Sequence, residues 1–387
     1  MKKRISLLLA LMMLLSVSVT AFAENNAPGE TWEYWESPEA AGFSSQSFVE
    51  LDNALNAANY GVPSDEVTTT AMMVIKDGKI VWSWGDITHQ CWGASMRKSV
   101  IDVLYGMYLK GYAVDESKAV LSLDDTLGEL GIVEEVAHDE YLNGRETVGD
   151  TNLLEIELSA TIRDLLMSSA GIYLPAANAA GLTEEQLASR GTIQPGSHFL
   201  YNNWEFNVLG TILAKATGNG ESIWNLLVND IAIPMQFEDF NENSMHYTGL
   251  KSISSHLAYH MFLSARDFAR IGVLMLNKGN WNGKQLISEE WATESVKRQA
   301  VDQGYGYLWW LPERDAPGWA DAYYASGTYG QRIICLPELN TVIVHRRSVK
   351  DETALARNNH QPYDEKASTI DQDVLYGYID KLIAGMK

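Results

Sequence analysis

Cysteine and basic residues are scarce in this chain. It has two cysteines among 387 residues, and 29 lysines and arginines against 50 aspartates and glutamates. Cys91 and Cys335 allow one disulfide at most, and a chain of this length can bury a core large enough to fold without one. We therefore expect two buried thiols, with a Cys91–Cys335 disulfide as the alternative.

The shortage of basic residues leaves a formal charge of −21 at pH 7. Proteins bind nucleic acids through lysines and arginines that neutralise phosphates, so this charge argues against a nucleic-acid partner. It also disfavours an anionic polymer as substrate, although the total charge does not fix the local field in a cleft.

Long apolar runs are missing after the first residues of the chain. Positions 2–4 are basic, residues 5–15 are apolar, and Ala-Phe-Ala stands at 21–23, which together have the form of a secretory signal. The apolar run is too short to span a bilayer, and no cysteine follows it to carry a lipid. We expect residues 1–23 to be a signal peptide, and the mature protein to be periplasmic or extracellular without stable membrane insertion. An uncleaved anchor is the alternative.

Motifs for metals, phosphates and the α/β-hydrolase nucleophile are also missing. His256 and His260 have the spacing of a zinc pair, but His-Leu-Ala-Tyr-His lacks the glutamate that a zincin requires. No glycine pattern of a phosphate-binding loop occurs. Ser95 lies in Gly-Ala-Ser-Met-Arg, which lacks the second glycine of the Gly-x-Ser-x-Gly elbow. We expect neither a metal nor a cofactor.

A serine and a lysine three residues apart are the most informative feature that is present. Ser95 and Lys98 lie in the run GASMRKS at residues 93–99, and on a helix these two positions share a face. A lysine in a partly dry cleft can lose its proton and then act as the base that activates a serine. The same tetrapeptide also occurs at ordinary helix starts, so its context decides.

Two further motifs follow in order. Tyr201 and Asn203 form Tyr-x-Asn after a turn at residues 194–197. A small-residue segment then precedes the apolar alternation of residues 332–337, and it contains Ala325, Ser326 and Gly327.

Ser-x-x-Lys, Tyr-x-Asn and a small-residue glycine strand, in this order, resemble the serine β-lactamase and penicillin-binding superfamily. The resemblance is closest to its class C-like branch, which includes β-lactamase-fold serine esterases, D-amino-acid peptidases and 6-aminohexanoate-dimer hydrolases. Residues 160–166 and 264–272 resemble connecting segments of the same family. The resemblance covers most of the mature chain and implies one domain over residues 24–387.

The resemblance implies a role for each motif residue. Ser95 attacks an acyl carbonyl, and Lys98 eases its deprotonation. Tyr201 accepts the serine proton and protonates the leaving group, while Asn203 bonds Lys98 and a substrate carbonyl. The backbone N–H groups of Ser95 and Thr328 form the oxyanion hole. The alternative is that Tyr201 is a buried tyrosine bonded to backbone and Asn203 a turn residue.

Aromatic and basic residues near these motifs allow further expectations. Trp309 and Trp310 are candidates to line the acyl pocket, or else belong to an aromatic strand of the core. Arg97 and Arg266 are expected to face solvent or to form structural ion pairs.

One departure from the family pattern bears on the substrate. In relatives the third motif usually begins with a lysine or histidine that holds a substrate carboxylate, whereas this chain has Ala325. A methyl group cannot bind a carboxylate, unless Arg332 or another residue reaches the cleft instead. This favours a neutral, small ester or amide substrate over a penicillin.

The hydrophobic pattern predicts a sheet built from both ends of the chain. Residues 71–75 and 80–84 read as a hairpin around an Asp-Gly turn. A later antiparallel meander and a closing helix are predicted from residues 323–326, 331–336, 341–346 and 370–383.

We therefore expect an α/β (α+β) fold with an antiparallel sheet of about five or more strands, flanked by helices. An α/β lobe of residues 24–110 and 320–387 would enclose a mostly helical lobe of residues 111–319. The predicted function is an exported serine hydrolase that acts on a small ester, amide or peptide-like substrate through an acyl-enzyme. A class C-type β-lactamase or D-amino-acid peptidase is one alternative. A non-catalytic acyl-binding sensor is another.

Overall fold

A computed structural model describes residues 27–178, 182–220, 222–348 and 368–387. The predicted signal peptide at residues 1–23 lies outside the described residues. No helix within the described ranges is both long and apolar enough to cross a bilayer.

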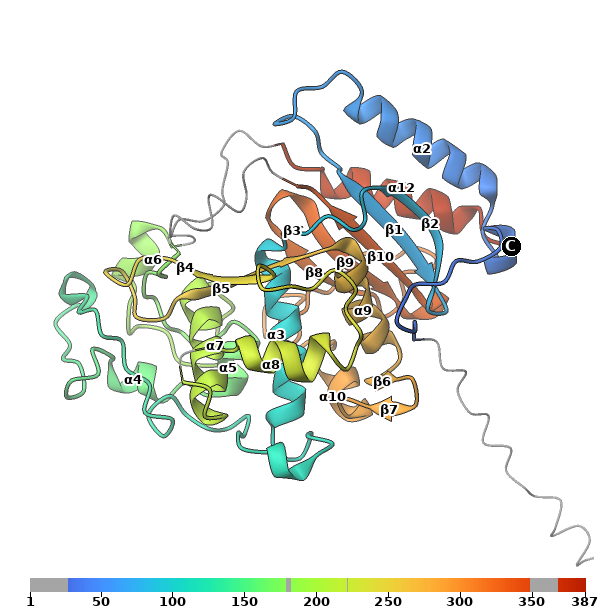
Figure 1. The fold of residues 1–387 in the computed structure, drawn as a ribbon. Helices are drawn as coiled ribbons and strands as arrows, with labels where there is room; N and C mark the ends of the chain where they lie inside the picture. The colour runs from blue at the N-terminus through green and yellow to red at the C-terminus, as the bar shows by residue number, and fades with distance from the viewer. Residues whose placement is uncertain (1–26, 179–181, 221, 349–367) are drawn as a thin grey trace, which may run out of the picture.

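A five-stranded antiparallel sheet forms the centre of the molecule (Figure 1). Its strand order is β2-β1-β10-β9-β8, so a hairpin from the start of the chain pairs with a meander from its end. In the central pairing, Ala71 lies opposite Arg346 and Lys76 opposite Thr341. The strands are β1 (Ala71–Lys76), β2 (Lys79–Gly85), β8 (Tyr323–Gly327), β9 (Gln331–Leu336) and β10 (Thr341–Arg346).

Helices cover both faces of this sheet. Alternate side chains of a strand point to opposite faces, and here Met72 and Val74 join one apolar cluster while Met73 and Ile75 join the other. The first face is covered by α2 (Ser45–Asn59) and α12 (Gln372–Ala384), which lie side by side in Figure 1. The second face is covered by α9 (Ala265–Leu276), which packs on β9 and β10.

The middle of the chain is mostly helical and lies beyond the second face of the sheet. The helix α3 (Arg97–Tyr108) connects the two parts, and all twelve of its residues are buried. The other helices are α4 (Glu155–Leu158), α5 (Ile162–Leu166), α6 (Glu184–Ala188), α7 (Asn203–Ala216), α8 (Trp224–Leu226), the π-helix η5 (Leu227–Ala232) and α10 (Glu289–Glu294). A small sheet has the order β3-β5-β4, and β6 pairs with β7; their bounds are β3 (Cys91–Trp92), β4 (Met245–Thr248), β5 (Ala258–Leu263), β6 (Asn280–Trp281) and β7 (Lys284–Gln285).

The predicted architecture is confirmed, with two differences. The antiparallel sheet of five strands, drawn from both chain ends, is present as expected. However, α9 covers the sheet although it lies within residues 111–319, the range predicted to form the helical lobe. The helix α2 was not predicted. Cys91 and Cys335 are both buried and are not joined in a disulfide.

Candidate active site

The backbone around Ser95 is held in a tight turn. The N–H of Gly93 donates to the carbonyl of Met261 in β5 at 2.8 Å, and Ala94 adopts a left-handed φ of 49°. A 3-10 turn, η2 (Ala94–Met96), then leads directly into α3. This geometry places Ser95, which is partly exposed, at the start of a buried helix.

The ammonium or amine group of Lys98 lies at the centre of the predicted catalytic residues. Its Nζ is 2.6 Å from Ser95 Oγ, 2.7 Å from Tyr201 Oη and 2.9 Å from Asn203 Oδ1. The fold therefore brings Ser95, Lys98, Tyr201 and Asn203 together from two segments that are far apart in the sequence. The roles of these residues in catalysis stay predictions.

Asn202, which was not singled out from the sequence, fixes the turn that carries Tyr201 and Asn203. Its side chain caps α7 by accepting from the N–H of Trp204 at 3.1 Å. Its amide donates to the carbonyls of Ile172 and Leu174 at 2.8 and 3.2 Å. An asparagine directly before an apolar helix is a recognisable N-cap signal, so this residue could have been predicted.

Burial sets the ionisation of the two central groups. Removal from water lowers the pKa of Lys98 well below its usual value, and the positive charge of Arg97 adds to this. Burial also raises the pKa of the Tyr201 phenol to about 12, against smaller opposing effects of a hydrogen bond to Ser95 and of nearby arginines. Both groups are therefore driven toward their neutral forms.

A neutral Lys98 can satisfy all of its contacts and act as a base. The Asn203 carbonyl oxygen can only accept, so it takes one N–H of the amine. If the second N–H donates to Tyr201, the remaining lone pair can accept from the hydroxyl of Ser95, which lies 2.6 Å away. The arrangement can therefore remove a proton from Ser95.

The third motif lies directly against the turn that carries Ser95. A Cβ atom added to Gly327 would be 2.6 Å from the carbonyl oxygen of Gly93 and 3.0 Å from the Cβ of Ala94. Ser326 is partly exposed and Thr328 is exposed. The pairing of the Thr328 and Ser95 N–H groups in an oxyanion hole stays a prediction.

Ala325 differs from what the sequence suggested. It lies opposite Ile333, and its side chain is fully buried in the core rather than exposed in the cleft. The adjacent strand instead supplies a cation, since Arg332 lies opposite Ser326.

Arg332 is close enough for its charge to act on Tyr201, one of the predicted catalytic residues. Its Nη1 donates to the carbonyls of Gly327 and Gln331 at 3.2 and 3.0 Å, and its charge acts on Tyr201. Its Nε is buried without a hydrogen-bond partner. A positively charged side chain therefore lies near the predicted catalytic residues although the third motif has none.

The two tryptophans predicted as possible pocket residues are in different environments. Trp309 is fully buried and donates to Asp102 Oδ2 at 2.9 Å, so its position favours the core alternative. Trp310 is half-buried, and its ring centroid is 5.5 Å from that of Tyr201. Trp310 therefore lies beside Tyr201, one of the predicted catalytic residues.

The two arginines expected to face solvent or to form ion pairs, Arg97 and Arg266, are also in different environments. Arg266 forms the expected structural ion pairs, at 2.8 Å to Glu238 and 2.5 Å to Asp239. Arg97, by contrast, neither faces solvent nor pairs with a carboxylate of the described residues. It is 1% exposed, and its Nη2 donates to the side-chain oxygen of Asn207 at 2.9 Å.

His256 and His260, which have the spacing of a zinc pair, each form a hydrogen bond with another side chain. His256 Nδ1 is 3.1 Å from the hydroxyl of Thr211, and His260 Nδ1 accepts from the Trp92 indole at 2.9 Å. Across the described ranges, no three His, Cys, Asp or Glu side chains are grouped so that they could hold a metal ion.

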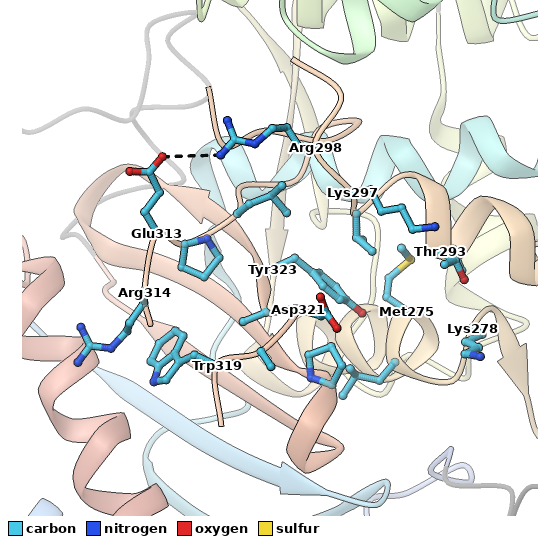
Figure 2. A pocket seen from close by; sticks show the side chains of 18 of the residues that line it. Met275, Lys278, Thr293, Lys297, Arg298, Glu313, Arg314, Trp319, Asp321 and Tyr323 are labelled. Carbon is cyan, nitrogen blue, oxygen red and sulfur yellow. Dashed lines mark ion pairs between the residues drawn. The ribbon is translucent and has the colours of Figure 1, made fainter. Parts of the chain in front are cut away.

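A large cavity of about 900 Å³ lies between the ends of α9 and α10 and the segment before β8 (Figure 2). None of the residues predicted for catalysis lines it. Several of its charged groups are neutralised by their own ion pairs, which are Lys278–Glu289, Arg298–Glu313 and Arg314–Asp380.

Comparison with known proteins identifies the family. The β-lactamase family model matches residues 63–347, so the chain belongs to the β-lactamase family, a family of hydrolases that share this fold. The matched range contains all of the predicted catalytic residues. No curated protein matches the chain.

Solved structures show the same fold at low sequence identity. A class C β-lactamase is 12% identical with a TM-score of 0.54, over 92% of this chain and 99% of its own. A protein from Bacillus anthracis that is provisionally named a 6-aminohexanoate-dimer hydrolase is 19% identical with a TM-score of 0.54, over 83% and 79%. EstCE1, a hydrolase with promiscuous acyltransferase activity, is 14% identical with a TM-score of 0.52, over 88% and 98%. The predicted resemblance is confirmed at the level of family and fold.

Proposed function

We propose that this protein is a serine hydrolase that cleaves a small ester or amide through an acyl-enzyme. The observation that carries the proposal is the distance of 2.6 Å between Lys98 Nζ and Ser95 Oγ, in a buried site that disfavours the charged lysine. A nucleophile within hydrogen-bond distance of a neutral base is the arrangement that covalent catalysis requires.

The proposed reaction uses one proton path in both half-reactions. Ser95 Oγ bonds to the acyl carbon while its proton passes to the Lys98 amine. The leaving alcohol or amine departs with a proton from Tyr201, which regains one from the Lys98 ammonium. Water then attacks the acyl carbon by the reverse path, which releases the acid and restores Ser95. The raised pKa of Tyr201, about 12, suits it to donate a proton rather than to rest as a phenolate.

Turnover of a short-chain p-nitrophenyl ester tests this proposal. We expect steady release of p-nitrophenol that greatly exceeds the enzyme concentration, and no such release from Ser95→Ala. A single stoichiometric burst without turnover would instead support a non-catalytic acyl-binding sensor. The absence of both burst and turnover across esters, linear amides, D-amino-acid amides and a chromogenic cephalosporin would refute the serine hydrolase.

The charge of the substrate is a separate question. The sequence based it on Ala325, whereas the structure makes Arg332 the residue that bears on it. Ala325 was expected to make the cleft neutral, but Arg332 favours the alternative of a substrate that carries a carboxylate, as in a β-lactamase or D-amino-acid peptidase. Phenyl butyrate and 3-carboxyphenyl butyrate differ by one carboxylate on the leaving group. The neutral-substrate proposal predicts that phenyl butyrate is at least as good a substrate and that Arg332→Gln leaves the ratio of the two kcat/KM values unchanged.

The carboxylate alternative predicts the opposite result. A charge-assisted hydrogen bond contributes about 1.5–3 kcal/mol, so Arg332→Gln would then lower kcat/KM for the carboxylated ester roughly ten- to a hundredfold, and the neutral ester would be little affected.

We also propose that the protein is exported and cleaved after Ala23, on the basis of the signal-like residues 1–23. N-terminal sequencing of the protein from the periplasm or medium should begin at Glu24. A protein that keeps its first residues and stays with the cells would contradict export.

A further inference from the structure

Arg97, the residue directly before Lys98, is a buried cation without a buried counter-charge among the described residues. The guanidinium lies 4.3 Å from the ring centroid of Tyr259 and donates to the amide oxygen of Asn207, while its Nε and Nη1 are buried without a hydrogen-bond partner. Arg190 shows the usual arrangement in the same protein, since it makes two hydrogen bonds of 2.8 Å to Glu157. Burial of an unpaired charge is costly, which suggests that Arg97 has another use.

The opposing helix offers amides at the positions where carboxylates would be expected. Asn203 and Asn207 are four residues apart on α7, so they share one face of that helix. Asn203 accepts from Lys98 and Asn207 accepts from Arg97. The two neighbouring basic side chains of α3 thus meet two neutral amides, so neither Asn203 nor Asn207 offsets the positive charge of Arg97 beside Lys98.

We propose that Arg97 is a positioning residue that keeps Lys98 in its neutral form, ready to accept the proton of Ser95, by repelling a second positive charge in the same dry interior. The inference rests on the proposed serine hydrolase and adds to it a residue that does not touch the substrate.

The other ionisable groups around Lys98 do not offset this repulsion. On α3 and α7, burial raises the pKa values of the Asp102 and Glu205 carboxyls well above their usual range, which favours their neutral forms. On β5, burial lowers the pKa of His260 well below its usual value, and the neighbouring basic groups Arg97 and Lys98 add to this. Arg332 on β9 is a further cation, and Tyr201 is neutral.

Two more distant carboxylates, on η5 and α10, and weaker attractions to aromatic rings do not offset the repulsion between Arg97 and Lys98. Asp230 is held by Tyr108 at the far end of α3, and Glu294 by Tyr112 beyond it. The rings of Tyr201 and Phe206, each 4.4 Å from Lys98 Nζ, attract a cation. A cation–π contact contributes about 0.5–2 kcal/mol, whereas full burial shifts a lysine by up to about 3–5 pKa units, or roughly 4–7 kcal/mol.

The sign of the effect on pH dependence follows from the active form. The neutral Lys98 is the base, so acylation increases as the pH rises through the pKa of Lys98. Loss of the positive charge at Arg97 removes a repulsion from the ammonium form, so the pKa of Lys98 rises. The acid limb of the profile then moves to higher pH.

Four variants separate charge from structure. Arg97→Met removes the charge, and Arg97→Lys keeps it. Asn207→Asp leaves Arg97 in place but gives it a carboxylate partner, and Asn207→Ala is its matched control, because both lose the donation to the carbonyl of His256. The measured quantity is the second-order rate of labelling by a fluorophosphonate probe, which phosphonylates Ser95 and so reports its nucleophilic reactivity without turnover.

The test compares the labelling rate at about pH 6 with the rate at about pH 9. We expect Arg97→Met and Asn207→Asp to lower the ratio of the first rate to the second by on the order of tenfold, because each variant removes or neutralises one positive charge near Lys98. Arg97→Lys and Asn207→Ala should keep the ratio of the unmodified protein within about twofold. An equal loss at both pH values in Arg97→Met would overturn the proposal and leave Arg97 a structural residue. If Arg97→Met does not fold, the comparison of Asn207→Asp with Asn207→Ala decides in the same way.

A second readout does not depend on the proposed reaction. In protein with labelled lysine side chains, NMR titration of the Lys98 signal, assigned by its absence from Lys98→Met, should show a higher pKa in Asn207→Asp than in Asn207→Ala. An unchanged Lys98 titration overturns the role of Arg97. Lack of any probe labelling in the unmodified protein, together with the shifted titration, overturns only the serine hydrolase.

Discussion

The contact between Gly327 and Gly93 gives a sharp test of how β8 is placed against the nucleophile. Gly327 has a φ of −139°, which is ordinary for a strand, so its conformation does not require glycine. The close approach does, because a Cβ atom would lie 2.6 Å from the Gly93 carbonyl oxygen. We therefore expect Gly327→Ala to push β8 away from the turn that carries Ser95.

The size of the effect follows from the contact. The added carbon is about 1 Å closer than van der Waals contact, and both neighbours are backbone or Cβ atoms that cannot rotate away. Overpacking of this kind costs about 1–3 kcal/mol of folding free energy. A displacement of about 1 Å in a catalytic group can cost roughly a hundredfold in rate. Activity should thus fall much more than stability.

Two measurements and one control check this. The kcat/KM for a p-nitrophenyl ester should fall by on the order of a hundredfold in Gly327→Ala, while urea unfolding shows a loss of about 1–3 kcal/mol. Gly377→Ala is the control, since a Cβ there meets nothing within 4 Å and the residue lies inside α12. It should be stabilising by about 0.5–1 kcal/mol with unchanged kcat/KM. Full activity in Gly327→Ala would refute the proposed contact between β8 and the nucleophile turn.

Three further outcomes follow from the site. Ser95→Ala should abolish fluorophosphonate labelling and reduce turnover by on the order of a thousandfold or more, and labelling that persists would place the nucleophile elsewhere. Lys98→Ala and Tyr201→Phe should each slow acylation, and the double variant should lose much less than the product of the two, because the residues share one proton path; multiplicative losses would contradict that path. Trp309→Phe should lower the free energy of unfolding by about 1–3 kcal/mol, because it removes the hydrogen bond that the Trp309 indole donates to Asp102, while kcat/KM stays within about twofold. A large fall in kcat/KM with unchanged stability would return Trp309 to the site.

The sheet could be predicted because its signals are local. Strand residues alternate between apolar clusters on two faces, and turns such as Asp77-Gly78 mark where each strand ends. The helix α2 gives a weaker pattern, since only Phe48, Leu51 and Leu55 of its fifteen residues are buried. Their i, i+3, i+7 spacing is nevertheless that of an amphipathic helix, so α2 could have been predicted from the sequence.

The motif residues of the candidate site could also be predicted, but their surroundings could not. The spacing of Ser95 and Lys98 implies a shared helical face, and the structure brings both groups together. Arg97 was misjudged because α3 is buried on every side, so helical periodicity gives no exposed face on which to place a charge. Arg332 lies opposite Ser326 on the neighbouring strand, and this position depends on the register of β8 and β9 rather than on any local pattern.

The pairing of β1 with β10 has a consequence for how the protein is made. Ala71 must pair with Arg346, which is far away in the sequence, and Gly327 must pack against the turn at Gly93. Such distant pairings slow folding, because much of the chain must be ordered before they form. A chain still being synthesised has already emerged with Ser95 and Lys98 but not with its third motif. On the proposed mechanism, the nascent protein should therefore have no activity until almost its entire length has been produced, and a product truncated before β8 would contain Ser95 without the strand that packs against its turn.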